Sequence, residues 1–261
     1  MQELAEIVYP YLTVVTLVMA RMLTALIVLP LFSSQNLPRM VRASIAMALT
    51  LFMLPMLEPQ AAGLTFSWHV IAMLLKEVGL GAILGFSFGM IFWAMENIGH
   101  LIDFQTGLTF TQTIDPLAGN QNSVHARLIL QLFFVYFVAV GGLRLFLETM
   151  YASYMVWPVM TFMPHGKPGW EKIFSDQISL MFALTLLFSA PALILLLLVD
   201  FGFGLLNRAA PNMQVYDLVR PLKSWLATLV LVIMLPFILD RTLQIIMRYR
   251  TLLPLLEQAI G

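Results

Sequence analysis

Charged residues inside the apolar stretches of this sequence are the first candidates for chemistry. Lys76 and Glu77 are neighbours, and Glu96 and Asp103 follow further along the chain. Carboxylates and a lysine in one apolar helix can form an ion or proton path, as in ion-coupled secondary transporters. A neighbouring lysine and glutamate can instead mark a helix end at the membrane interface. The residues alone leave both interpretations open.

Signatures of other chemistry are weak or missing. The sequence contains no cysteine, and its four histidines lie at no metal-ligand spacing. It has no Walker loop and no dinucleotide-binding fingerprint. Gly81, Gly85 and Gly89 repeat at every fourth residue, a spacing that predicts a tight contact between helix backbones. We therefore expect no catalytic residues, no metal site and no cofactor, and we expect that the protein is not an enzyme.

The composition is typical of an integral membrane protein. Hydrophobic residues make up 60% of the chain and charged residues 11%, with a formal net charge of zero. Soluble domains carry about 25% charged residues. The mean hydropathy of +0.88 agrees with this class. A chain without net charge gives no sign of a nucleic-acid partner, so we expect a membrane protein of the inner-membrane type.

Isolated charges in the apolar runs predict helices that pack inside an assembly. A charge at the bilayer centre costs about 2.5–3.5 kcal/mol even on a lenient scale. We expect the charged residues in these runs to face protein: Arg21, Lys76, Glu77, Glu96, Asp103, Arg144, Glu148 and Asp200. Arg144 and Glu148 lie one helical turn apart, so we expect them to pair with each other.

Apolar segments predict the helices that position these residues. They span residues 7–32, 43–57, 68–100, 128–163, 177–199 and 224–239. Residues 43–57 are short for a span, because crossing about 30 Å of hydrocarbon takes roughly 20 residues. The positive-inside rule places the loops with Arg39 and Arg42, and with Arg220 and Lys223, in the cytoplasm.

A polar stretch, residues 101–127, separates two of these segments. Gly107, the Asp115–Pro116 step and Gly119 favour turns and interrupt a helix. Irregular backbone at membrane depth is tolerated only where it is buried in protein or lines a water-filled cavity. The stretch is therefore interpreted as a re-entrant or pore-facing loop, although a solvent-exposed connection fits the pattern equally well.

A second polar stretch, residues 202–223, is expected to form a turn. We expect Pro211 and Pro221 to bound the turn, and the polar residues in and beside it are Asn207, Arg208, Asp217, Arg220 and Lys223. The pattern fits a solvated, charged turn on the cytoplasmic side. It also fits a docking site for a partner protein.

The sequence resembles a known family. WAMENIGHLIDFQTG, residues 93–107, followed by the turn Ile114-Asp115-Pro116, is similar to the middle of the FliR/SctT family of type III secretion export-gate proteins. SYMVWPVMTFMP (153–164) and DFGFGLLNRAAPNMQVYDLVRPLKS (200–224) resemble the virulence branch, the YscT/SpaR-type proteins. The similarity runs across nearly the whole chain.

This resemblance implies an architecture and a function. It implies an SctR/FliP-like helical portion, residues 1–175, fused to an SctS/FliQ-like helical hairpin, residues 176–261. It further implies a core subunit of the export gate, in the bacterial inner membrane and within the secretion basal body. With SctR (FliP-like) and SctS (FliQ-like) subunits, it would form the channel for unfolded export polypeptides. An ion-coupled secondary transporter is the alternative.

The resemblance also assigns roles to the two polar stretches. It implies a pore plug in the first, made of Thr109, Phe110, Thr111, Gln112, Thr113, Ile114, Asp115, Pro116, Leu117, Gly119, Asn120 and Asn122. It implies a docking site for the SctU (FlhB-like) switch protein in the second, made of Asn207, Arg208, Pro211, Asn212, Asp217, Arg220 and Lys223.

Overall fold

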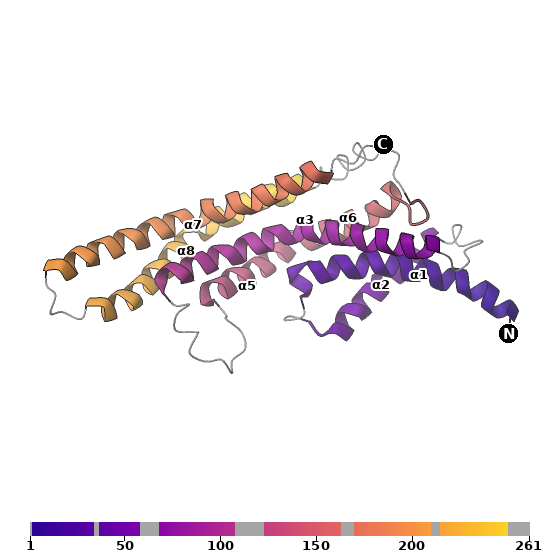
Figure 1. Cartoon of the computed structure of the whole chain (residues 1–261), viewed down its shortest axis with the longest axis horizontal. Coiled ribbons are helices and arrows are strands. Elements are labelled where there is room, and N and C mark those ends of the chain that lie inside the picture. Colours follow the sequence, from indigo (N-terminus) through magenta and orange to yellow (C-terminus); the bar gives the residue numbers. More distant parts are fainter. Residues whose placement is uncertain are drawn as a thin grey trace. The chain divides into compact units, whose positions relative to one another are not determined.

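All the regular structure in the described part of the chain is helical. The computed structural model describes residues 2–33, 37–57, 68–107, 123–162, 170–209 and 215–249. The elements are α1 (Gln2–Val28), the 3₁₀ helix η1 (Pro30–Phe32), α2 (Arg39–Leu57), α3 (Trp68–Thr106), α5 (Val124–Ala139), α6 (Gly142–Val156), α7 (Trp170–Ala209) and α8 (Val215–Tyr249) (Figure 1). The predicted all-α fold is confirmed. The division at residues 175 and 176 stays a prediction.

Several helices are long and apolar enough to cross a membrane. Among the described residues these are Tyr11–Val28, Trp68–Thr106, Ser175–Ala209 and Val219–Arg248. The pair α5 and α6 meets the same criteria jointly but is bent by 67°. Four spans, or five if the bent pair is counted, agree with the membrane-protein class expected from the composition.

The prediction of one continuous helix over residues 128–163 is wrong. Gly141 has a φ of +80°, a left-handed conformation that glycine adopts without steric penalty. Helix α5 therefore ends before it, and α6 starts at Gly142 with Gly141 as its N-cap. The helix predicted for residues 68–100 instead continues to Thr106 and stops at Gly107, which also has a φ of +80°.

The predicted turn at residues 202–223 is also largely wrong. Helix α7 continues to Ala209, and α8 begins at Val215 and contains Pro221. A proline inside a helix removes one amide hydrogen bond and bends the helix without necessarily ending it, especially in membrane helices. Pro221 was therefore a poor marker of the end of the turn.

The chain divides into two compact units that α3 connects. Unit 1 comprises Met1–Met90, Gly141–Ile173 and Met247–Gly261, and unit 2 comprises Ile91–Val140 and Phe174–Ile246. Unit 1 thus holds α1, α2, α6 and the first part of α3. Unit 2 holds the rest of α3, α5, and most of α7 and α8.

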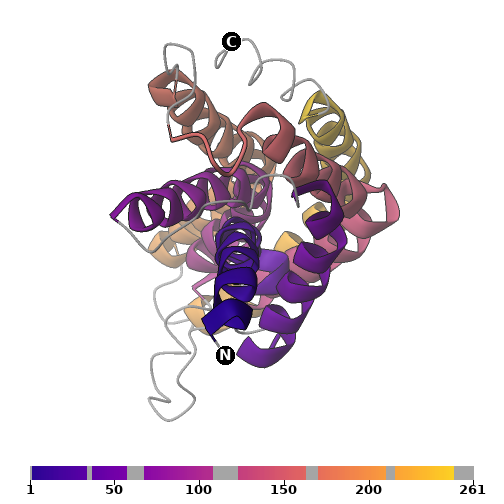
Figure 2. The ribbon, with the colours of Figure 1, turned by 90° about the vertical axis from the view of Figure 1, so that its right-hand side faces the viewer.

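The core of unit 1 depends on close approach of α1 and α3. A Cβ atom on Gly85 would lie 2.6 Å from the carbonyl oxygen of Ala25, and one on Gly81 would overlap the carbonyl of Arg21. Gly89 is buried. The tight contact predicted from the glycine spacing is confirmed for Gly81 and Gly85. On the other side of α1, α2 packs against it (Figures 1 and 2).

Aromatic side chains fill the core of unit 2. The ring of Phe92 on α3 lies 4.8 Å from that of Phe133 and 4.9 Å from that of Phe137, both on α5. Phe188 on α7 meets Phe237 on α8 edge to face, with 6.1 Å between the ring centroids. These contacts join the helices in pairs and set the frame that carries the polar groups described next.

Candidate functional site

A buried ion pair lies at the centre of unit 1. Arg21 on α1 and Glu77 on α3 form two bonds, with Nε 2.5 Å from Oε2 and Nη2 2.9 Å from Oε1. Both side chains are fully buried. The guanidinium also donates to Ser153 Oγ at 3.1 Å and to the carbonyl of Trp157 at 3.0 Å, so that it ties α6 to the other two helices.

Lys76 extends this cluster to the segment that follows α6. Its Nζ lies 2.8 Å from Glu77 Oε1 and donates to the carbonyls of Pro158, Val159 and Thr161 at 2.8–3.1 Å. The lysine therefore satisfies backbone carbonyls at and beyond the end of α6. Its charge and that of Glu77 are used within unit 1 and do not mark a helix end in solvent.

The remaining candidates for an ion path have separate partners. Glu96 lies 3.8 Å from His100 on the same helix, and both are partly exposed. Asp103 pairs with His125 in unit 2. The structure therefore brings only Lys76 and Glu77 of the predicted path together.

The expectation that these charges face protein holds for the buried ones. Arg21, Glu77 and Asp103 are buried. Arg144 and Glu148 form the predicted pair, with Nε 2.7 Å from Oε1, but the side chain of Arg144 is 83% exposed. The pair is therefore not covered within this chain, and its contact with protein in an assembly stays a prediction.

A single carboxylate joins the end of α3 to the start of α5. Asp103 lies one turn before the end of α3, and Ser123 is the N-cap of α5. Asp103 Oδ2 accepts hydrogen bonds from the hydroxyl of Ser123 and, at 3.1 Å, from the amide of His125. Asp103 Oδ1 contacts His125 Nδ1. We call this group the loop base, because residues 108–122 connect the two helices that it joins.

The loop base extends to α8. His125 Nε2 lies 2.9 Å from Thr228 Oγ1, which is also 2.9 Å from the carbonyl of Ser224. An ionised carboxylate can only accept, so Nδ1 carries a proton where it faces Asp103. A neutral imidazole then accepts the Thr228 proton at Nε2.

Glycine makes this approach of helices possible. A Cβ atom on Gly99 of α3 would overlap the backbone of His125 and Ala126 at the start of α5. Ser123 Oγ accepts from the amide of Ala126 at 3.1 Å, the usual N-cap bond. The close contact at Gly99 and the hydrogen bonds of Asp103 and Ser123 thus fix the first turn of α5 against α3.

The Asp–His–Thr connectivity is that of a nucleophile with its base, but the surroundings do not support acyl chemistry. Such chemistry needs free donors that stabilise an oxyanion. The amides of His125 and Ala126 are already hydrogen-bonded, and Thr228 lies inside α8.

A second pattern, GFSFG at residues 85–89, has the spacing of a nucleophile elbow. It lies within α3, where the hydroxyl of Ser87 donates to the carbonyl of Ile83.

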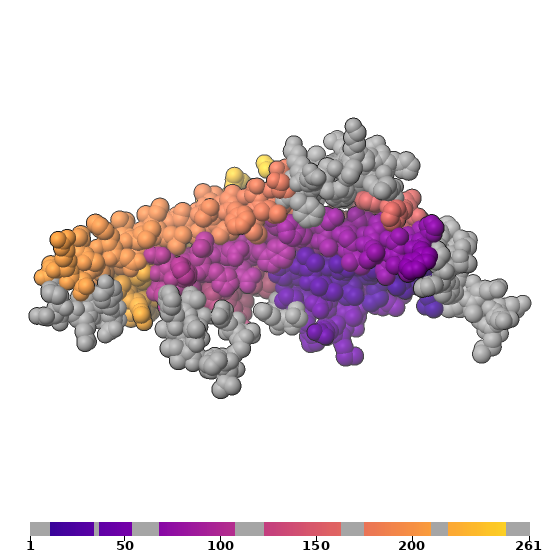
Figure 3. Space-filling view, viewed as in Figure 1, coloured from indigo at the N-terminus to yellow at the C-terminus, as the bar shows by residue number. Residues whose placement is uncertain are grey.

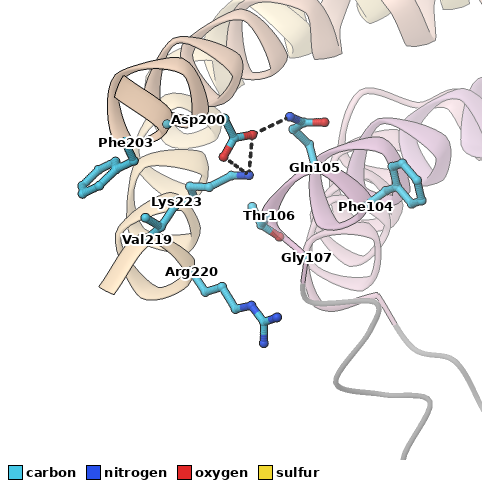
Figure 4. Close-up of a pocket in the computed structure, with 10 residues that line it drawn as sticks. Phe104, Gln105, Thr106, Gly107, Asp200, Phe203, Val219, Arg220 and Lys223 are labelled. Atoms are coloured by element: carbon cyan, nitrogen blue, oxygen red, sulfur yellow. Dashed lines mark hydrogen bonds and ion pairs between the residues drawn. The ribbon is translucent and has the colours of Figure 1, made fainter. Parts of the chain in front are cut away.

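A second polar cluster joins α7 and α8 to the end of α3. Lys223 Nζ lies 2.8 Å from both carboxylate oxygens of Asp200, and Gln105 Nε2 donates to Oδ2 at 3.0 Å (Figure 4). These residues line a pocket of about 440 Å³. Arg220 lines it too, but Figure 4 shows its guanidinium pointing away from the cluster. Arg220 is exposed and forms no ion pair with the described residues.

The structure describes only some of the predicted docking residues. Asn207 and Arg208 lie in the last turn of α7, and Arg220 and Lys223 lie on α8. Asp217 is on α8 too, with its side chain outside the description. Pro211, Asn212 and the predicted plug residues from Thr109 to Asn122 lie outside the described residues. Among the described residues, no three His, Asp or Glu side chains gather as a metal site needs.

Comparison with known proteins decides the family. The model of the family described as "Bacterial export proteins, family 1" matches residues 12–249. The chain belongs to this family, the FliR/SctT family of type III secretion export proteins. The resemblance seen in the sequence is thereby confirmed, and protein transport is the function class.

Relatives from virulence and flagellar systems share this family. The chain is 30% identical to Yop proteins translocation protein T of Yersinia pestis over 231 residues, which cover 88% of each chain. It is 30% identical to secretion system apparatus protein SsaT of Salmonella typhimurium over 253 residues, 92% of this chain and 93% of the relative. It is 26% identical to flagellar biosynthetic protein FliR of Bacillus subtilis over 218 residues, 83% and 84% of the two chains.

Sequence reasoning on this family member did not find the partners of its buried charges. Arg21 was expected to face protein, but Glu77 lies 56 positions away. His125 and Thr228 were not singled out, and they are 103 positions apart. The one local signal was Ser123, a residue type that favours N-caps, just before an apolar run.

Replacing Glu77 by glutamine is expected to destabilise unit 1 of this export protein. The change leaves Arg21 as a buried cation without its counter-charge, which costs about 3–5 kcal/mol. The control Glu148→Gln removes an exposed pair on α6 worth about 0.5 kcal/mol or less. We expect a clear drop in the thermal aggregation midpoint of the purified export complex in detergent for Glu77→Gln, and no drop for Glu148→Gln. Equal midpoints would show that the Arg21–Glu77 pair does not hold unit 1 together.

Proposed function

We propose that this chain is a core subunit of a type III secretion export gate in the bacterial inner membrane. Together with SctR-type and SctS-type subunits, it would form the channel through which unfolded export polypeptides pass. The observation that carries the proposal is the loop base, because a polar segment between two apolar helices has both ends joined by Asp103. Such a segment suits a position inside a pore better than one facing lipid.

The surface of α7 and α8 supports partners in the membrane. In the most apolar window of α7, 33% is buried within this chain. The corresponding share is 22% for α8 and 67% for α3. Figure 3 views one side of α7 (orange) along which no other described helix covers it. Exposed side chains include Phe182, Leu186, Leu198 and Phe201 on α7 and Trp225, Val232 and Ile233 on α8. Patches of this extent mark contacts with protein or lipid.

Within this gate we propose residues 109–122 as the plug of the resting channel. The support is the clamp at both ends of the segment, where Gly107 ends α3 and Ser123 caps α5. Apolar Phe110 and Ile114 and the polar residues between them suit a narrow aqueous passage.

We further propose that the end of the α7–α8 hairpin docks a switch protein of the SctU type. The cations available to such a partner are Arg208 and Arg220, which are exposed. Lys223 is committed to Asp200, with its side chain only 7% exposed. It therefore joins α8 to α7 within the hairpin, while the arginines meet acidic groups of the partner.

Deleting residues 110–121 tests the plug. We expect the gate to assemble and cells that express the full apparatus to leak small solutes, because nothing would close the passage. The measurement is uptake of a small dye, with a deletion of residues 60–65 as the control. An assembled gate with the permeability of the wild type would sink the plug assignment.

Removing the charge of Arg220 tests the docking surface. Arg220→Gln should reduce co-purification of the SctU-type partner, because losing one member of a desolvated charge pair costs about 2–5 kcal/mol. Arg241→Gln, also exposed on α8, is the control and should change nothing. Lys223→Gln should instead lower the stability of the chain itself. Unchanged co-purification with Arg220→Gln would contradict docking at this arginine.

A further inference from the structure

We propose that the hydrogen-bonded chain Asp103–His125–Thr228 couples the loop base, which comprises Asp103, Ser123 and His125, to the α7–α8 hairpin. This coupling fixes the position of the loop base. Through this chain, the place of α8 sets how the first turn of α5 sits against the last turn of α3. The proposal rests on the proposed function, in which the segment between α3 and α5 works as the plug. It assigns positioning roles to Asp103, His125 and Thr228.

The first support is the position of the polar contacts. The described contacts between the hairpin and the end of α3 include two polar bridges. One runs from Thr228 through His125 to Asp103, and the other runs from Lys223 through Asp200 to Gln105. Asp103 and Gln105 are two residues apart on α3, so both helices of the hairpin are tied to the same turn.

The second support is that the loop base has no slack. Asp103 is 1% exposed, Ser123 6% and His125 4%, and Asp103 accepts from two donors of the α5 first turn at one oxygen alone. The contact at Gly99 leaves no room for α5 to shift toward α3. A rotation of the imidazole therefore breaks its contact with Asp103 or its bond to Thr228.

The third support is the hydroxyl of Thr228. It is the α8 group that meets His125 Nε2, the ring nitrogen that does not face Asp103. Removing this hydroxyl leaves Nε2 of the buried His125 without its protein partner. An unsatisfied buried polar group costs free energy, so the imidazole is expected to turn toward another partner. A shift of α8, as would follow from docking at the end of the hairpin, acts on the same bond. Coupling between the two places is reciprocal.

The test compares two matched substitutions in the complete export complex. Thr228→Val removes the hydroxyl that bonds His125 and keeps the shape of the side chain. Thr242→Val is the control, since Thr242 also lies on α8 and its hydroxyl donates to the carbonyl four residues earlier. The first readout is hydrogen–deuterium exchange of the amides of His125 and Ala126, and the second is dye leakage through the assembled gate.

We expect Thr228→Val to speed exchange of these two amides about fivefold, the factor that corresponds to one lost hydrogen bond. Leakage should rise with it, and Thr228→Ser should restore both. Thr242→Val should change neither. Asp103→Asn should reproduce the effect of Thr228→Val from the other end of the chain.

The outcomes separate the coupling from the plug. If Thr228→Val leaves the exchange of both amides unchanged, the coupling is wrong whatever the plug does. The coupling is also wrong if the 110–121 deletion leaks and Thr228→Val speeds exchange without leaking. If the deletion does not leak, the plug fails, and the exchange of the amides still decides whether α8 positions the loop base.

Discussion

An arginine and a glutamate without solvent contact can remain inside apolar helices only as partners. Arg21 and Glu77 meet this constraint through two hydrogen bonds between α1 and α3. Arg21 also donates a hydrogen bond to Ser153 on α6. The ring of Tyr154 lies 4.1 Å from the guanidinium carbon, and its hydroxyl donates to the carbonyl of Val18. The glycines of α3 allow the backbones to come close enough for this. In unit 1, α1, α3 and α6 are therefore joined at the buried guanidinium of Arg21.

A related constraint shapes unit 2, where Asp103 is buried but the side chain of Asp200 is 39% exposed. Asp103 and Asp200 are carboxylates in long apolar helices, and each draws donors from other helices. Asp103 thereby joins the two helices that flank residues 108–122, and Asp200 joins the hairpin to α3. The channel proposed for this protein would be closed at rest and would open for export. Polar clamps inside an apolar frame can hold such a passage closed and can be released without unfolding the frame.

Local spacing in the sequence predicted what depends on local geometry. The glycine repeat predicted the contact of α1 and α3, and the one-turn spacing of Arg144 and Glu148 predicted their pair. The length and apolar character of the segments predicted helices, and the residues around 93–107 and 200–224 indicated the family.

The partners of buried charges depend on tertiary packing, which one sequence does not display. Arg21 and Glu77, or His125 and Thr228, come from helices far apart in the chain. Backbone exceptions were hidden as well. Gly141 ends a helix inside an uninterrupted apolar run, whereas Pro221 sits inside a helix that its presence argued against. At Pro221 packing outweighs the usual preference of the residue, whereas Gly141 follows the preference of glycine for a left-handed conformation at a helix end.

The central claim is that this chain is one subunit of a membrane assembly and completes its structure there. Native mass spectrometry of the chain co-expressed with SctR-type and SctS-type subunits tests it most directly. The account predicts one copy of the chain in a hetero-oligomer with both partners, and an aggregated chain when it is expressed alone, because the apolar faces of α7 and α8 stay uncovered. A monodisperse, folded monomer in mild detergent that binds neither the SctR-type nor the SctS-type subunit would contradict this claim.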